Sequence, residues 1–229
     1  MNDERGATPA VGKVDFGGLR RVTPVSRLFG FERGLCIDRY YIENFLEARR
    51  EDVRGRVLEV GDPAYTRRFG GDRVERSEVL HVFPGEEGAT LYGRLDDPDF
   101  PLEDEALDCL ILTQVFCVVP NLQQAVRTVH RILKPGGTLL ASLPGLAQIS
   151  RYDMDRWGDY WRFTDLAARH LFGTAFGTER VEVATHGNVL AVVAYLHGLA
   201  ACELTEDELA HHDPDYPVVV TVRATKERA

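Results

Sequence analysis

The fourteen-residue segment 151–164 carries the residue types of a site for a polyhydroxy ligand. Aromatic rings alternate there with guanidinium and carboxylate groups, a composition too polar for a buried core and too aromatic for a plain surface loop. Apolar ring faces can stack on a sugar while polar groups bond its hydroxyls. A loop that packs its aromatic side chains beneath the N-terminal arm explains the pattern equally well. The residues of this segment that are expected to bind such a ligand, as the substrate, are Tyr152, Trp157, Tyr160, Trp161 and Arg162.

Three side chains are candidate general bases for a reaction at this site. Asp153 and Asp159 lie in the segment itself, and nothing in the sequence chooses between them. His186 follows a predicted strand, so it is expected at the same sheet edge. Gln114 also follows a predicted strand, and its amide can orient an acceptor or a cofactor, although an ordinary helix-cap turn accounts for it equally well.

A short apolar run that ends at Gly61 predicts a strand followed by a tight turn. Glycine permits a close approach of the backbone to a nucleotide-like ligand. Glu59 and Asp62 flank this glycine and are expected beside the same ligand. The alternative is an ordinary strand-to-helix turn, in which the two carboxylates are solvated charges.

Composition excludes several classes of protein. The 229 residues contain 27 Lys and Arg against 36 Asp and Glu, a formal net charge of −9 that argues against a generally basic nucleic-acid binder. A hydrophobic content of 44% excludes a disordered chain. The longest apolar run, 189–202, is shorter than the roughly 20 residues of a membrane span. Because the first residues are charged and lack an apolar stretch, we expect no secretory signal and a cytoplasmic location.

The sequence predicts no metal site. The four cysteines have no paired C-x-x-C spacing, which argues against both a zinc site and a disulfide framework. His211 and His212 stand near Asp213 and Asp215, but adjacent histidines point in different directions. A solvated loop before the last strand is the better interpretation of this cluster.

The elements that must position these residues alternate between strand and helix. Residues 1–37 are expected to form an N-terminal arm and 38–229 a single doubly wound α/β domain. A helix is expected to begin with Asp38 as its N-cap, and a second one, 122–133, with Asn121. Further helices are expected at 164–172 and 188–202. The expected strands are 56–61, 78–83, 90–92, 107–112, 138–143, 181–185 and 218–222.

The segment Arg131-Ile132-Leu133-Lys134-Pro135-Gly136-Gly137-Thr138-Leu139-Leu140 closes a helix and opens a strand. Together with strands 57–61 and 106–112, it makes residues 38–222 resemble class I S-adenosylmethionine-dependent methyltransferases. The segment 151–164 is similar to one found in small members of the methyltransferase type 11 group. The resemblance implies a Rossmann-like sheet of seven strands, with the last antiparallel to its neighbour, and S-adenosylmethionine as cofactor.

In the family, an acid and glycines after the first strand hold the methionine part of the cofactor, and Glu59 and Gly61 match them. The next two family glycines fall on Pro63 and Tyr65, which are departures. A carboxylate that normally binds the ribose hydroxyls is matched by His81. The helix that carries Arg39 and Tyr40 is expected to cover the mouth of the site.

The acid that contacts the adenine amino group in the family is matched by Arg94, which cannot accept a hydrogen bond. In a register shifted by two or three residues, Asp96 or Asp97 takes this place instead.

The resemblance implies methyl transfer to a small molecule or to a sugar or glycan acceptor. The alternative is a methyltransferase-fold protein with a degraded adenosine site, which serves as a binding partner or catalyses a non-methyl reaction. No nucleic-acid or membrane partner is expected. A nicotinamide-dependent dehydrogenase is excluded, because the turn after 57–61 lacks the Gly-x-Gly-x-x-Gly pattern.

Overall fold

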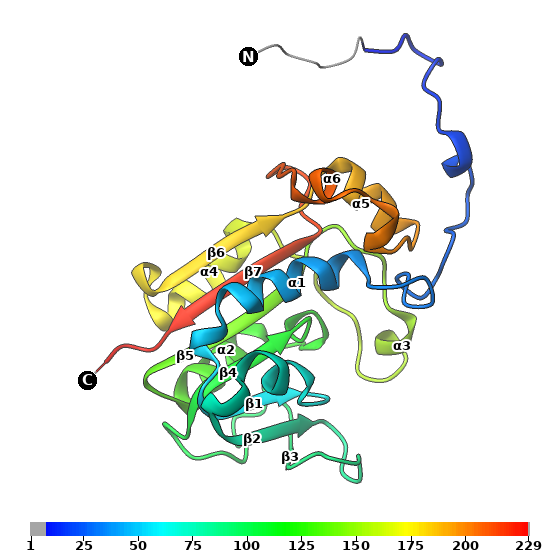
Figure 1. Cartoon of the computed structure of the whole chain (residues 1–229). Helices are drawn as coiled ribbons and strands as arrows, with labels where there is room; N and C mark the ends of the chain where they lie inside the picture. The colour runs from blue at the N-terminus through cyan, green and yellow to red at the C-terminus, as the bar shows by residue number, and fades with distance from the viewer. Residues whose placement is uncertain (1–7, 229) are drawn as a thin grey trace.

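Seven runs of apolar residues pair into one sheet in the computed structural model, which describes residues 8–228 (Figure 1). The order across the sheet is β3-β2-β1-β4-β5-β7-β6. Only β7 runs antiparallel to its neighbours. The strands are β1 Gly55–Val60, β2 Val74–His81, β3 Leu91–Tyr92, β4 Leu107–Thr113, β5 Leu133–Pro144, β6 Val181–His186 and β7 Val219–Thr225. This arrangement confirms the predicted doubly wound sheet and its antiparallel last strand.

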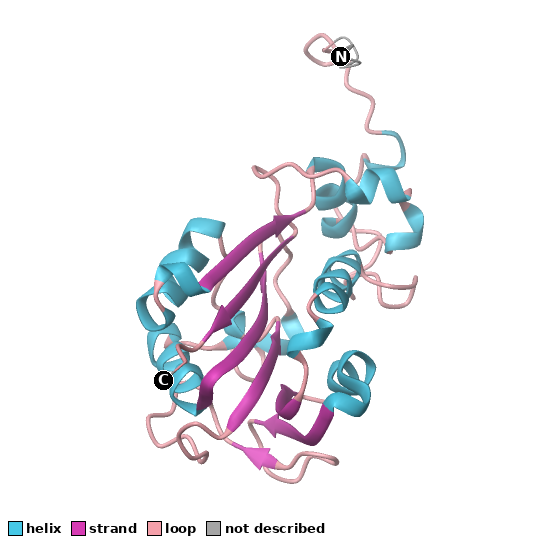
Figure 2. Cartoon of the chain, turned by 60° about the vertical axis from the view of Figure 1, so that its left-hand side comes forward, coloured by secondary structure: helices cyan, strands magenta, loops and turns pink. Residues whose placement is uncertain are grey.

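Helices cover both faces of the sheet (Figure 2). The helices are α1 Ile37–Ala48, α2 Leu122–Ile132, α3 Arg151–Met154, α4 Asp165–Phe176, α5 Val189–Leu196 and α6 Glu206–Ala210. One core cluster joins α2 and α4 to the sheet, and the other joins α1, α5 and α6 to its opposite face. Successive strand residues divide between the clusters: Cys109 and Ile111 belong to one, Leu110 and Leu112 to the other. Burial on both faces explains why the strands are continuous apolar runs.

Three helices begin where the sequence predicts a capping side chain. The Asn121 side chain accepts from the Gln124 amide at 3.1 Å, and Thr164 accepts from Ala167 at 3.2 Å. Asn188 accepts from Ala191 at 3.0 Å. Its Nδ2 also donates to the carbonyls of Glu208 and His211, at 2.7 and 2.8 Å. Asn188 therefore caps α5 and holds the end of α6 beside it.

Three predicted helix boundaries are wrong. Asp38 is not the N-cap of α1, because the helix begins at Ile37 after Cys36 and Asp38 is buried in its first turn. α5 ends at Leu196 rather than at Cys202. Its apolar stripe does not extend further because Gly198 turns the chain with φ +70° and packs against Ser26 of the arm. α4 continues past 172 to Phe176.

The Lys-Pro-Gly-Gly segment lies at the start of β5, which follows α2 directly, and the pairing with β4 is irregular there. Gly136 has φ +79°. A Cβ on Gly137 would lie 2.9 Å from the Lys134 carbonyl oxygen and 3.0 Å from that of Leu107. The backbone at Gly137 thus has no room for a side chain, which accounts for glycine at this position.

Two isosteric substitutions distinguish the capping of a helix by asparagine from the contacts of Asn188 with the end of α6. Asn121→Asp keeps the cap acceptor, so the free energy of unfolding should change by less than about 0.5 kcal/mol. Asn188→Asp keeps its cap but loses two buried N–H donors, so it should cost about 2 kcal/mol or more. Chemical denaturation of both variants measures the difference. Equal effects would contradict the assignment of Asn188 as a link between α5 and α6.

Candidate cofactor and acceptor site

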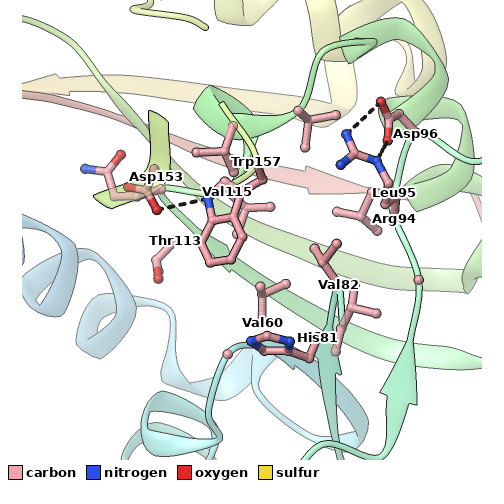
Figure 3. A pocket seen from close by; sticks show the side chains of 16 residues that line it. Val60, His81, Val82, Arg94, Leu95, Asp96, Thr113, Val115, Asp153 and Trp157 are labelled. Atoms are coloured by element: carbon pink, nitrogen blue, oxygen red, sulfur yellow. Dashed lines mark hydrogen bonds and ion pairs between the residues drawn. The ribbon is translucent and has the colours of Figure 1, made fainter. Parts of the chain in front are cut away.

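A cavity of about 210 Å³ lies at the carboxyl ends of β1, β2 and β4. β1 pairs with β2 on one side and with β4 on the other, so the strand order reverses at this point. Ligands of open α/β sheets bind at such a reversal. The apolar part of the lining consists of Val60, Leu80, Val82, Leu95, Val115, Val118 and Val119. The remaining lining residues are Gly61, His81, Gly93, Arg94, Asp96, Thr113, Gln114, Asp153 and Trp157 (Figure 3).

Gly61 leaves one wall of the cavity open. Its φ is +88°, and no heavy atom lies within 4 Å of the position a Cβ would take. Its amide donates to the Leu80 carbonyl at 3.0 Å, which holds the turn against β2. The backbone at Gly61 can therefore be approached closely by a ligand.

Glu59 and Asp62, expected beside the ligand, are not among the residues that line the cavity. The Glu59 carboxylate is 4% exposed and accepts from the amides of Thr66 and Tyr65, at 2.7 and 3.2 Å. Burial raises the pKa of Glu59, and these two hydrogen bonds oppose the shift. Asp62 is exposed and accepts from the Ala64 amide at 2.8 Å. Both carboxylates shape the turn after β1 instead of forming the cavity wall.

His81 ends β2, as the predicted position of the ribose-binding residue requires, and lines the cavity. Its Nδ1 lies 3.2 Å from both the amide nitrogen and the carbonyl oxygen of Phe83. Nδ1 accepts from the amide in one tautomer and donates to the carbonyl in the other, so in both cases Nε2 is the ring nitrogen left for a ligand. His81 thus offers one hydrogen-bonding atom where a carboxylate would offer two acceptors.

Arg94 and Asp96 line the same end of the cavity and pair with each other. Arg94 Nε donates to Asp96 Oδ1 at 3.1 Å, and the Asn121 amide lies 3.4 Å from Oδ2. Asp97 instead accepts from the Asp99 amide and does not line the cavity. The family resemblance matches Arg94 to the acid that contacts adenine. The structure has an acid two residues further along the chain, Asp96, and Arg94 neutralises part of its charge (Figure 3).

Gln114 has a strained backbone with φ +57°. Its amide donates to the carbonyl and hydroxyl oxygens of Ser142, at 3.0 and 3.1 Å, and its carbonyl accepts from the Cys117 thiol. The side-chain Nε2 lies 3.4 Å from Asp38 Oδ2. Its Oε1 is buried without a hydrogen-bond partner among residues 8–228. Strain of this kind gathers at functional sites, and an unpaired buried acceptor calls for a donor from a ligand.

Two residues of the segment 151–164 reach the cavity. Asp153, in α3, and Trp157, just after it, both line the wall above the sheet. Trp157 Nε1 donates to Asp153 Oδ1 at 2.9 Å. Figure 3 shows the indole over Val60 and His81, with Asp153 on the side of Thr113. Of the three candidate bases, Asp153 is the one that the structure brings to the cavity.

The other aromatic residues of this segment lie around the cavity rather than in its lining. Tyr152 is 61% exposed, with the Arg156 guanidinium 3.5 Å above its ring. The Tyr160 amide donates to the Cys117 carbonyl at 2.8 Å. Trp161 Nε1 donates to the Val119 carbonyl at 2.9 Å. These contacts tie the segment to the loop after β4.

Asp159 and Arg162 form an ion pair within the segment. Arg162 Nη1 donates to Asp159 Oδ1 at 2.6 Å, and the Ser150 amide donates to Oδ2 at 2.9 Å. Burial acts to raise the pKa of Asp159, but these hydrogen bonds outweigh it and lower the pKa below its ordinary value. A carboxylate with both oxygens engaged is poorly suited to accept a proton.

His186 and the residues of α1 lie at different distances from the site. His186 lines a separate cavity between α1 and the strands β6 and β7, where Nε2 lies 2.9 Å from Thr221 Oγ1. Burial lowers the pKa of His186, and the charge of His212 adds to this effect. Arg39 reaches the cavity rim, with Nη1 3.4 Å from Thr113 Oγ1. Tyr40 packs edge-on against Tyr41.

Sequence reasoning missed two acids of the site region. Asp38 is 6% exposed beside Gln114, yet it was expected to be a helix cap. Asp38 stands three and four residues before Tyr41 and Ile42, on the helix face that carries the buried apolar side chains, and this spacing was the available signal of its burial. Asp96 was given only as an alternative to Arg94, because the sequence alone does not fix the register of the loop after β3.

Within residues 8–228 no three His, Cys, Asp or Glu side chains gather in a way that could hold a metal ion. None of the helices described there is both long and apolar enough to cross a membrane.

Residues 84–141 match the profile of a methyltransferase domain family. No curated protein matches the chain. Among solved structures, a S-adenosylmethionine-dependent methyltransferase of Thermotoga maritima is 19% identical, with 86% of this chain and 95% of that one covered and a TM-score of 0.53.

Two further solved structures are similar. The [4+2]-cyclase SpnF is 18% identical over 85% of this chain and 82% of its own, with a TM-score of 0.53. The N-methyltransferase NodS of Bradyrhizobium japonicum, solved with S-adenosyl-L-homocysteine, is 13% identical over 84% and 89%, with a TM-score of 0.50. The fold and the family match agree with the cofactor class expected from the sequence. The similar structures confirm the expected class I methyltransferase fold, and the family match over residues 84–141 agrees with the resemblance seen in the sequence.

Proposed function

We propose that this protein is a S-adenosylmethionine-dependent methyltransferase that acts on a small-molecule or sugar acceptor. The observation that carries the proposal is the unpaired Oε1 of Gln114 in a cavity whose wall is open at Gly61. Both features provide for a ligand with hydrogen-bond donors at this edge of the sheet. When bound there, S-adenosylmethionine supplies a methyl group already activated on a sulfonium.

The polar residues of the cavity can be assigned to parts of this cofactor. Gly61 and Gln114 would face its amino-acid portion, which carries N–H donors for the unpaired Gln114 oxygen. His81 Nε2 would form a hydrogen bond with a ribose hydroxyl. Asp96 would accept from the adenine amino group, while Val82 and Leu95 would bury the faces of the base.

Asp153 is proposed to orient and deprotonate the acceptor. One of its oxygens is engaged by Trp157, and the residue lines the cavity on the side of Thr113. The exposed ring of Tyr152 beside it offers an apolar face for a sugar or another ring. Methyl transfer asks mainly for in-line alignment and, where needed, removal of one proton.

One observation favours the alternative of a methyltransferase fold with another activity. Arg94 donates hydrogen bonds to both oxygens of the Asp96 carboxylate. These bonds weaken the carboxylate as an acceptor for the adenine amino group. The similar SpnF fold is that of a protein named as a [4+2]-cyclase. Calorimetry with S-adenosylhomocysteine separates the two functions, because only a working adenosine site binds it with useful affinity.

Substitution of Gly61 tests the position of the cofactor. Gly61→Val should raise the Kd for S-adenosylhomocysteine by roughly 100-fold or more, because a branched side chain fills the open wall. Gly88→Val is the matched control: Gly88 has φ +84°, nothing within 4 Å of a Cβ, and no part in the cavity lining. It carries the same backbone strain and should leave binding unchanged. Equal affinities of the two variants would place the cofactor elsewhere.

Substitution of Asp96 tests the recognition of adenine. The parent protein should prefer S-adenosylhomocysteine to S-inosylhomocysteine, which presents a carbonyl where adenine has an amino group. Asp96→Asn should narrow this preference about ten-fold, because an amide can donate as well as accept. Asp97→Asn, which changes the next residue along the chain, outside the cavity lining, should keep the preference of the parent. A preference that survives Asp96→Asn would assign adenine recognition to another group.

A further inference from the structure

We propose that Trp157 is a cofactor-binding residue, which roofs the nucleoside half of the cavity and forms with His81 and Phe83 an aromatic wall. The sequence pattern assigned Trp157 to the acceptor, together with the other rings of its segment. The inference rests on the proposed function and names a residue, outside the positions taken over from the family, that recognises the cofactor.

The aromatic wall joins two segments that are far apart in the sequence. Trp157 lies 6.5 Å from the His81 ring, at an interplanar angle of 82°, and 6.2 Å from the Phe83 ring. His81 and Phe83 lie 6.5 Å apart. His81 is the last residue of β2, where the ribose-binding carboxylate is expected. In Figure 3 the indole lies next to Val60, among the side chains that line the cavity.

Contacts within the segment hold the Trp157 indole in place. Trp157 Nε1 donates to Asp153 Oδ1 at 2.9 Å, and the backbone amide of Trp157 donates to the Asp153 carbonyl at 3.0 Å. Tyr152 packs edge-on against it at 5.9 Å, and Arg156 covers the Tyr152 ring. A side chain fixed on this many sides loses little conformational entropy when a ligand binds.

The chemistry of the site explains why a roof of this kind is needed. The position at the end of β2 holds His81, whose Nδ1 is already engaged by the backbone of Phe83. The two hydrogen bonds that a carboxylate would accept from the ribose hydroxyls are therefore reduced to one. An indole can recover affinity by burying the nucleoside and stacking on it, which does not depend on charge.

The segment that carries Trp157 is anchored to the cavity floor. The amides of Tyr160 and Trp161 donate to the Cys117 carbonyl, at 2.8 and 3.2 Å. Trp161 Nε1 donates to the carbonyl of Val119, which lines the cavity. Trp161 itself does not line the cavity, so it is a control within the same segment.

The chain contains two tryptophans, which makes fluorescence a direct test. In the variant Trp161→Phe, Trp157 is the remaining fluorophore, and saturating S-adenosylhomocysteine should change its emission. In Trp157→Phe, Trp161 remains, and the emission should change little. The opposite pattern would overturn the proposal.

Affinity provides the second measurement. Trp157→Ala should raise the Kd for S-adenosylhomocysteine, measured by calorimetry, by roughly ten- to a hundred-fold. The Kd for free adenosine should rise by the same factor, since the contact is with the nucleoside. Trp157→Phe, which keeps a ring, should lose less, and Trp161→Phe, which loses only the hydrogen bond to the Val119 carbonyl, should raise the Kd least of the three variants. Circular dichroism verifies that each variant is folded.

The outcomes separate this inference from the proposed function. If the parent binds S-adenosylhomocysteine and Trp157→Ala binds it equally well, the roof is wrong and the methyltransferase assignment stands. A loss seen with S-adenosylhomocysteine but not with adenosine would also overturn the roof, because the contact would then be with the amino-acid portion. If the parent binds neither ligand, the proposed function fails, and the inference fails with it. Should Trp157→Ala not fold, Trp157→Phe and the fluorescence comparison decide.

Discussion

The buried carboxylate of Glu59 is the constraint on which the site depends. An ionised carboxylate removed from water is costly unless hydrogen bonds replace its hydration, and Glu59 obtains two of them from the amides of Thr66 and Tyr65. Those amides belong to the first turn of the segment after β1, so the charge fixes where that segment starts. The chain between Glu59 and Tyr65 must then reverse sharply, and Gly61 with φ +88° allows it to do so. The opening at Gly61 follows from a charge that lies outside the cavity.

A second constraint acts from the neighbouring strand. Gln114 would relax out of its positive φ unless its amide and carbonyl were both engaged, and Ser142 and Cys117 engage them. Ser142 lies on β5, which pairs with β4. The strained residue is thus held by the sheet itself, and its side chain is directed between the cavity and Asp38 of α1. The first turn of α1 and the carboxyl end of β4 are joined at this point.

The parts of the fold and of the site that could be predicted are those determined by residues close together along the chain. The strands are apolar because both faces of the sheet are covered, and Asn121 caps α2 through a bond three residues away, so both leave a pattern in the sequence. The place of His81 at the end of β2 came from the family resemblance, since the strand pattern alone predicted a strand that runs on to residue 83. The pairing of Asp96 with Arg94 and the burial of Asp38 against Gln114 depend on how loops and helices meet in space. No periodicity along the chain records such contacts.

The residues that depart from the family pattern all change the interactions of the proposed site in the same direction. His81 at the place where the family resemblance implies a carboxylate, and the pairing of Asp96 with Arg94, both reduce the negative charge that the proposed site would offer to a nucleoside. The cavity wall in the same region is apolar at Val82 and Leu95 and is covered by Trp157. Recognition based on burial depends less on ionic strength than recognition by charge, since salt screens only the latter. Binding of the nucleoside should therefore change little with salt, although the chain as a whole carries a net charge of −9.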